Sequence, residues 1–132
     1  MYQIDFETRH AYASSDRGIE VTVELHYLDS SVRLPAKIDT GAAVCCFQRA
    51  YADELGIQVE AGRRESFATA TGSFVAYGHE IEINCLGHRN FALVYFAADI
   101  DFSRNVLGRQ GWLDHHRMGL IDYESLLYLS SS

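Results

Sequence analysis

Apolar and polar side chains alternate along two segments in the first third of the chain. Apolar residues occupy every second position between residues 19 and 25, and again between residues 32 and 38. A period of two is typical of a strand with one buried face. Residues 29–31 (Asp-Ser-Ser) have side chains that favour a turn. The pattern predicts a β-hairpin in which Pro35 marks an unpaired position and whose second strand ends at Asp39.

The middle of the chain predicts one short helix between β-rich regions. Residues 49–55 favour a helix, and Gly56 directly after them is a typical C-terminal cap. Residues 67–83 are β-like, with a turn at residues 70–73. Residues 91–96 form a continuous apolar run, which is typical of a strand covered on both faces.

The last quarter of the chain predicts a second helix and two closing strands. The helix is expected to begin near Gly108 and to carry Trp112 and His116 over the core. Trp112 is interpreted as a core residue, and Asp114-His115-His116 as a cationic or polar helix end. The closing strands are expected at residues 118–122 and 126–129. Together the elements predict a mostly β fold with one or two short helices.

The composition excludes several classes of protein. Hydrophobic residues make up 48% of the 132 residues, so we expect one packed domain spanning residues 1–132. The formal net charge of -7 argues against binding to nucleic-acid phosphates. No apolar run approaches the length of a membrane span, and the first residues do not resemble a secretory signal. We therefore expect a cytoplasmic protein with neither a nucleic-acid nor a membrane partner.

The cysteines and histidines follow no pattern typical of a disulfide framework or a metal site. Cys45, Cys46 and Cys85 are an odd number of thiols with two adjacent, which favours a reducing compartment. The chain has no Cys-x-x-Cys or His-x-x-x-His pair, so we expect no metal and no other cofactor. Cys45 and Cys46 are interpreted as core residues rather than as nucleophiles.

The candidate chemical centre is the segment Asp39-Thr40-Gly41-Ala42. The acid follows an alternating strand, and Gly41 permits a tight turn before small and apolar residues resume. Far downstream, Val106 and Leu107 precede a glycine, and a glycine-bearing hairpin lies between the two segments at residues 70–73. Asp-Thr-Gly alone is weak evidence, because a chance match in a chain of this size is of the order of a few per cent. The three elements together carry the prediction.

In this order, the three elements resemble the retropepsin family of aspartic peptidases, in particular its bacterial and other cellular members. The resemblance runs from about residue 21 to residue 129 and implies a closed β-barrel with a flap hairpin. It implies that Asp39 is catalytic and that Thr40 locks two active-site loops together. The implied support residues are Thr40, Gly41, Val106, Leu107 and Gly108. The implied substrate-binding residues are Gly41, Ala42, Ala70, Thr71, Gly72 and Ser73.

The motif occurs once, and the proposed chemistry needs two acids. Peptide hydrolysis by carboxylates uses one to take a proton from water and another to donate to the carbonyl oxygen. The chain is too short for a second lobe with its own acid, so the resemblance and the chemistry both imply a homodimer that binds an extended peptide or protein. The apolar residues 126–129 either form a sheet shared with the partner or pair within their own chain.

The sequence departs from the retroviral members of the family at three places. Ala43 stands where they have an acid, so Arg109 lacks that partner and the grip on the substrate main chain is in question. The predicted flap turn has one glycine where theirs have several. Residues 2–17 have no counterpart and form either an extra strand or a segment that covers the groove. These departures leave an alternative function open, a weak or inactive peptidase fold that dimerises and binds a peptide or protein partner.

Overall fold

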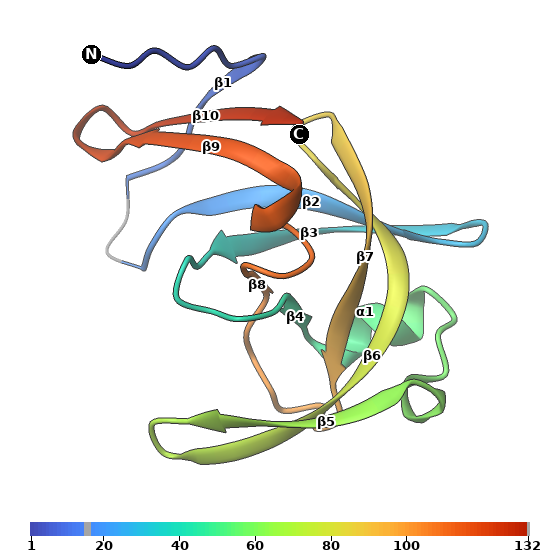
Figure 1. Ribbon diagram of the computed structural model, residues 1–132. Coiled ribbons are helices and arrows are strands. Elements are labelled where there is room, and N and C mark those ends of the chain that lie inside the picture. Colours follow the sequence, from blue (N-terminus) through green and yellow to red (C-terminus); the bar gives the residue numbers. More distant parts are fainter. Residues whose placement is uncertain (15–16, 132) are drawn as a thin grey trace.

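A computed structural model describes residues 1–14 and 17–131 (Figure 1). Strands dominate it, which confirms the mostly β fold. In chain order the elements are β1 (Thr8–Ala11), β2 (Glu20–Tyr27), β3 (Ser30–Ile38), β4 (Cys46–Phe47), α1 (Arg49–Glu54), η1 (Val59–Ala61), β5 (Arg63–Thr69), β6 (Gly72–Cys85), β7 (His88–Ala97), β8 (Val106–Leu107), η2 (Leu113–His115), β9 (His116–Ile121), η3 (Asp122–Glu124) and β10 (Leu126–Ser131), where η marks a 3-10 turn. No helix of the described residues is long and apolar enough to cross a membrane.

The larger sheet has seven strands in the order β2-β3-β8-β4-β7-β6-β5. An additional pairing of β2 with β6 joins this order back to its first strand. In Figure 1, β6 and β7 run side by side through the molecule, and the β5–β6 hairpin extends at the end far from β1. Short strands β4 and β8 lie inside this arrangement, so they and the loops beside them are fixed by neighbours on both sides.

The predicted hairpin of β2 and β3 is confirmed, although its turn is shorter than expected. Ser30 already belongs to β3, and the turn is made by Leu28 and Asp29, with Leu28 at a φ of 52°. Pro35 lies opposite Thr22 within the ladder, so the expectation of an unpaired position was wrong. A proline fits an antiparallel ladder where its nitrogen faces away from the neighbouring strand.

The alternating side chains of the hairpin form one side of the core. Val21, Val23 and Leu25 of β2 are 3%, 0% and 0% exposed. Leu34 of β3 and Trp112 are buried with them, so Trp112 is a core residue as expected. The short helix α1 also forms where it was predicted.

The prediction that residues 91–96 form a strand covered on both faces was wrong for its first half. Phe91 is 74% exposed and Ala92 and Leu93 are half-buried, whereas Val94 to Phe96 are buried. The first half of β7 pairs only with β6, whereas Tyr95 and Phe96 pair with β4 as well. An apolar run therefore indicated the strand correctly but not the extent of its burial.

The α-helix predicted to begin near Gly108 does not form. Gly111 has a φ of 102°, a conformation that ends any right-handed helix, and the only helical turn here is the three-residue η2. His116 is already the first residue of β9. Strands β9 and β10 confirm the two closing strands that were expected.

The smaller sheet has three strands in the order β1-β10-β9. Thr8 to Ala11 form β1 and pair with β10, so the extra-strand interpretation of the N-terminal segment is correct for these residues. β10 therefore has a neighbour from its own chain on each side. The apolar terminal strand thus pairs within its own chain, and a sheet shared with a partner stays a prediction.

His88 joins this terminal sheet to the larger sheet. The side chain is 8% exposed, and its Nε2 lies 2.8 Å from the hydroxyl of Thr8 in β1. Its Nδ1 lies 2.7 Å from the hydroxyl of Ser131 in β10. One imidazole thus connects β7 to both ends of the chain, a role that the sequence pattern did not indicate.

Candidate active site

Asp39 directly follows β3, and its main chain is fixed on both sides. Its N–H donates to the carbonyl oxygen of Leu107 (3.0 Å), and its own carbonyl oxygen accepts from the N–H of Ala42 (3.1 Å). The carboxylate oxygen Oδ1 accepts from the N–H of Gly41 (2.9 Å). Within the described residues the other oxygen, Oδ2, has no hydrogen-bond partner. The loop therefore presents one free oxygen of a half-buried carboxylate.

Strand β8 and the glycine after it support this loop from behind. β8 lies parallel to β3 and antiparallel to β4. A Cβ on Gly108 would lie 2.1 Å from the carbonyl oxygen of Val44 and 2.8 Å from that of Ala42, so only glycine fits there without a shift of the main chain. The N–H of Arg109 then donates to the carbonyl oxygen of Ala42 (2.9 Å). The predicted support segment thus contacts the predicted catalytic loop.

Thr40 takes no part in the side-chain contacts of this loop within the described residues. The residue is exposed, and its hydroxyl makes no hydrogen bond within residues 1–14 and 17–131. Its neighbour Ala43 is exposed as well. The side of the loop that carries Thr40 is therefore open in a single chain.

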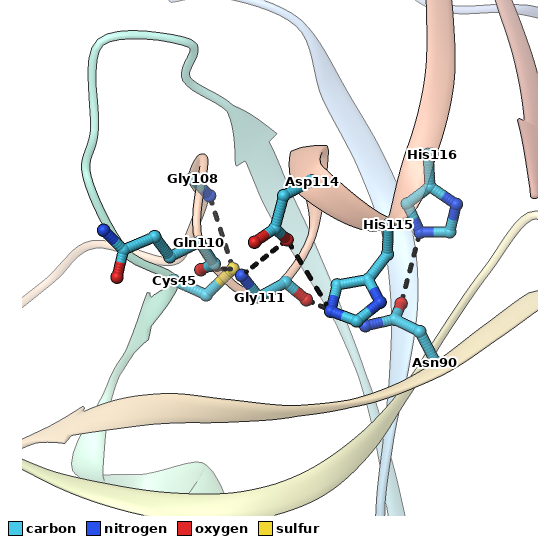
Figure 2. A network of polar contacts seen from close by, with 8 residues as sticks. All are labelled: Cys45, Asn90, Gly108, Gln110, Gly111, Asp114, His115 and His116. Atoms are coloured by element: carbon cyan, nitrogen blue, oxygen red, sulfur yellow. Dashed lines mark hydrogen bonds and ion pairs between the residues drawn. The ribbon is translucent and has the colours of Figure 1, made fainter. Parts of the chain in front are cut away.

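Cys45 is part of the support of the loop (Figure 2). Its Sγ accepts from the N–H of Gly108 (3.4 Å) and donates to the carbonyl oxygen of Gln110 (3.7 Å). Burial raises the pKa of Cys45 to about 12, and burial likewise raises the pKa of Cys46 to about 12. Both thiols stay protonated at ordinary pH, so they are poor nucleophiles, as expected for core cysteines.

Asp114 and His115 do not form the polar end of an α-helix, because no α-helix is present there. The carboxylate of Asp114 instead accepts from the N–H of Gly111 (3.0 Å), as Figure 2 shows. The Nε2 of His116 lies 3.2 Å from the side-chain oxygen of Asn90. The side-chain nitrogen of Asn90 donates to the carbonyl oxygen of Gly111 (2.8 Å). These contacts fix the loop that follows Gly108, which makes them structural.

The β5–β6 hairpin faces the Asp39 loop across a cleft of about 400 Å³. Ala70, at the turn, lines this cleft together with Gly41 and Ala42. The other predicted substrate-binding residues, at 71–73, are exposed and do not line the cleft of a single chain. The hairpin turn itself is Ala70-Thr71, within the expected segment.

Aromatic side chains that the sequence analysis did not single out form one wall of the cleft. Phe67 and Phe74 are paired across the hairpin, with ring centroids 5.5 Å apart. Phe74 stacks on Phe102 of the loop before β8, at 4.8 Å. All three line the cleft with Asp39. Phe67 and Phe74 are equally spaced from the hairpin turn, which is the sequence signal that indicates such a pair.

Arg104, which the sequence analysis also missed, lines the same cleft between Phe102 and β8. The next residue, Asn105, accepts from the N–H of Lys37 through its carbonyl oxygen (2.9 Å). Its side chain accepts from the N–H of Gln48 (3.0 Å) and donates to that residue's side-chain oxygen (2.8 Å). The loop that carries Arg104 is thus anchored to β3 and to the start of α1.

The chain is similar to solved structures of aspartic proteases, whereas no protein-family model and no curated protein sequence matches it. The crystal structure of a retropepsin-like aspartic protease from Rickettsia conorii is similar over 92% of this chain and 98% of its own, at a TM-score of 0.67 and 16% identity. EIAV protease complexed with the inhibitor HBY-793 is similar over 71% of this chain and 84% of its own, at a TM-score of 0.56 and 18% identity. The chain therefore has a retropepsin-like fold.

Proposed function

We propose that this chain is an aspartic endopeptidase that acts as a homodimer, with a water molecule held between the Asp39 carboxylates of the two copies. The observation that carries the proposal is the position of Asp39. Its carboxylate is oriented by Gly41, keeps one oxygen free and lines a cleft under the β5–β6 hairpin. An extended peptide would lie in this cleft, and the hairpin would close over it as a flap.

A single chain contributes one acid to the cleft. Among the described residues that line it, Asp39 is the only carboxylate. An isologous interface brings a residue near the twofold axis against its own copy, which supplies the second acid. Thr40 is exposed, so its hydroxyl is available to join the two loops. These features support a dimer axis beside Asp39.

The proposed reaction needs no covalent intermediate. Two carboxyl groups about 3 Å apart hold one proton between them. The ionised group takes a proton from water, which attacks the peptide carbonyl carbon, while the protonated group donates to the carbonyl oxygen. The tetrahedral intermediate then collapses: the group that took the proton from water gives it to the amine nitrogen, the C–N bond breaks, and the other carboxylate takes back a proton from a hydroxyl of the intermediate.

The terminal sheet limits how the dimer can form. β10 already has β1 on one side and β9 on the other, so a partner strand cannot insert beside it. The partner would instead contact the Asp39 loop and the outer edges of the sheet, β1 or β9.

The three cysteines are free and buried, which supports a reducing, cytoplasmic location.

Replacing Asp39 by Asn tests the proposal. The variant should lose at least about a thousandfold in peptide cleavage, because the amide cannot take the proton from water. Incubation with a denatured protein mixture at mildly acid and neutral pH, followed by mass spectrometry, measures cleavage. Thermal unfolding and light scattering of the variant should match the wild type. Cleavage that survives the substitution would contradict the mechanism.

A second function is supported by Arg109. This exposed guanidinium has no ion pair within the described residues, in accord with the absence of an acid at Ala43. If this loss weakens the grip on the substrate main chain, the dimer binds a peptide without cutting it. The same incubation separates the two functions, since cleavage blocked by a statine-type inhibitor excludes a protein that only binds.

A further inference from the structure

Arg104 is the only cation among the described residues that line the cleft of Asp39. The rest of the lining is small or apolar apart from Asp39 itself and Thr69, with an aromatic wall at Phe67 and Phe74. Asp39 and Arg104 are thus the only charged residues on the described lining, in a chain whose formal net charge is -7. The position of this charge therefore bears on which peptides the cleft accepts.

The loop on either side of Arg104 is fixed. Two residues earlier, Phe102 stacks on Phe74, and its N–H donates to the carbonyl oxygen of Asp99 (3.1 Å). One residue later, Asn105 bonds to Lys37 and Gln48. A cation on an anchored main chain loses less conformational entropy when it binds a ligand than one on a mobile loop.

The guanidinium itself is not neutralised. Within residues 1–14 and 17–131, no carboxylate forms an ion pair with Arg104. It also borders an adjoining cleft of about 230 Å³ that contains Lys37 and Glu20, two opposite charges. Arg104 thus adds an unmatched positive charge where the two clefts meet.

We propose that Arg104 makes the cleft select peptides that carry an acidic side chain within a few residues of the bond to be cut, next to an apolar or aromatic residue. The inference rests on the proposed peptidase function and names its substrate class. The apolar residue packs against Phe67 and Phe74, and the carboxylate pairs with Arg104. Because a homodimer has two such arginines, an acid on either side of the bond is accepted.

Matched peptides test the preference. Their ends are acetylated and amidated, so that a terminal carboxylate cannot replace the side chain. They share one sequence with Phe at the cleaved bond, and Glu, Gln or Lys is placed in turn at each of the four positions on either side. At the best position, kcat/KM should be about tenfold higher for the Glu peptide than for the Gln peptide, because one charge-assisted hydrogen bond contributes a factor of this order. Lys should be the poorest of the three.

Charge reversal at Arg104 provides the decisive variant. In Arg104→Glu the order should invert, so that the Lys peptide is cut faster than the Glu peptide. The control is Arg33→Glu, an exposed residue of β3 that lines neither cleft, which changes the net charge equally and should keep the preference of the wild type. Equal rates for Glu and Lys peptides in the wild type, or a preference unchanged in Arg104→Glu, would overturn the inference.

Peptide binding separates this inference from the proposed function. The same peptides, labelled with a fluorophore, are titrated with Asp39→Asn and with Asp39→Asn/Arg104→Glu, and anisotropy is measured. Tighter binding of the Glu peptide by the first protein and of the Lys peptide by the second supports the role of Arg104, even if the wild type cuts none of the peptides. Selective binding without any cleavage by the wild type would refute the proposed peptidase function but not the role of Arg104. Equal affinities would refute the role of Arg104 alone.

Discussion

The Asp39 region and the terminal sheet differ in what a single chain supplies. Around Asp39 the main chain is fully anchored by β8 and Gly108, yet the cleft has one carboxylate and Thr40 is exposed without a partner among the described residues. In the terminal sheet, β10 is paired on both sides and His88 connects the sheet to β7. The first region thus has an anchored main chain but only one acid for the proposed reaction, whereas the central strand of the second region is paired on both sides.

Under the proposed mechanism, the difference indicates where a second copy would complete the site. A strand with both edges paired gains nothing from a partner, whereas an acid that must share a proton gains the second half of its site. We therefore expect the partner to be required for activity rather than for folding. The dimer should be separable from the stability of the chain.

The largest effect is expected from Gly108→Ala, which breaks the anchor of the Asp39 loop. The new Cβ would lie 2.1 Å from the carbonyl oxygen of Val44, and only a shift of the main chain could relieve this clash. The free energy of unfolding should fall by about 3 kcal/mol, and peptide cleavage should be lost. Urea unfolding measures the first and the peptide assay the second. A variant as stable and as active as the wild type would show that β8 does not support the loop.

A smaller effect is expected from the terminal sheet on acidification, through His116 at the start of β9. Burial lowers the pKa of His116 from 6.5 to about 4, with nearby His88 and His115 adding to the shift. Because the folded-state pKa is the lower one, the unfolded chain binds the proton more tightly. Stability is therefore full above about pH 6.5 and falls as the pH drops towards 4, by about 2 kcal/mol when partial exposure is allowed for.

The variant His116→Gln removes this titration. Its free energy of unfolding, measured in urea at pH 7 and at pH 4.5, should decline less than that of the wild type between the two values. Parallel declines would show that another group causes the acid sensitivity. The measurement also indicates whether the fold survives at the mildly acid pH where paired carboxyl groups commonly act.

The sequence predicted the strands well because they depend on local patterns, whereas the role of the Asp39 motif stays a prediction. The alternation in β2 and β3, and the small residues after Asp39, are read directly from neighbouring positions. The α-helix near Gly108 was predicted wrongly because its apolar residues suit a loop over the core as well as a helix, and the φ of Gly111 decides between them. The pairing of β10 with β1 joins residues 8–11 to residues 126–129, a contact that no local pattern contains.

The candidate site was predicted in part for the same reason. The family resemblance implies that the segment ending at Gly108 supports the Asp39 loop, so the contact between Gly108 and Val44 was expected. Arg104 and Phe102 belong to a loop without a regular sequence pattern, so their place in the cleft was not. Their place in the cleft results from Phe74 and from the hydrogen bonds of Asn105. Tertiary packing, rather than local propensity, positions these side chains.

Subunit mixing tests the central claim most directly. A fixed amount of wild type is incubated with an equal amount of Asp39→Asn under conditions that let subunits exchange, and cleavage is then measured. If each site needs one Asp39 from each copy, random pairing leaves about half the original activity, because mixed dimers are inactive. Unchanged activity would mean that one chain suffices, and it would contradict the paired-carboxylate mechanism.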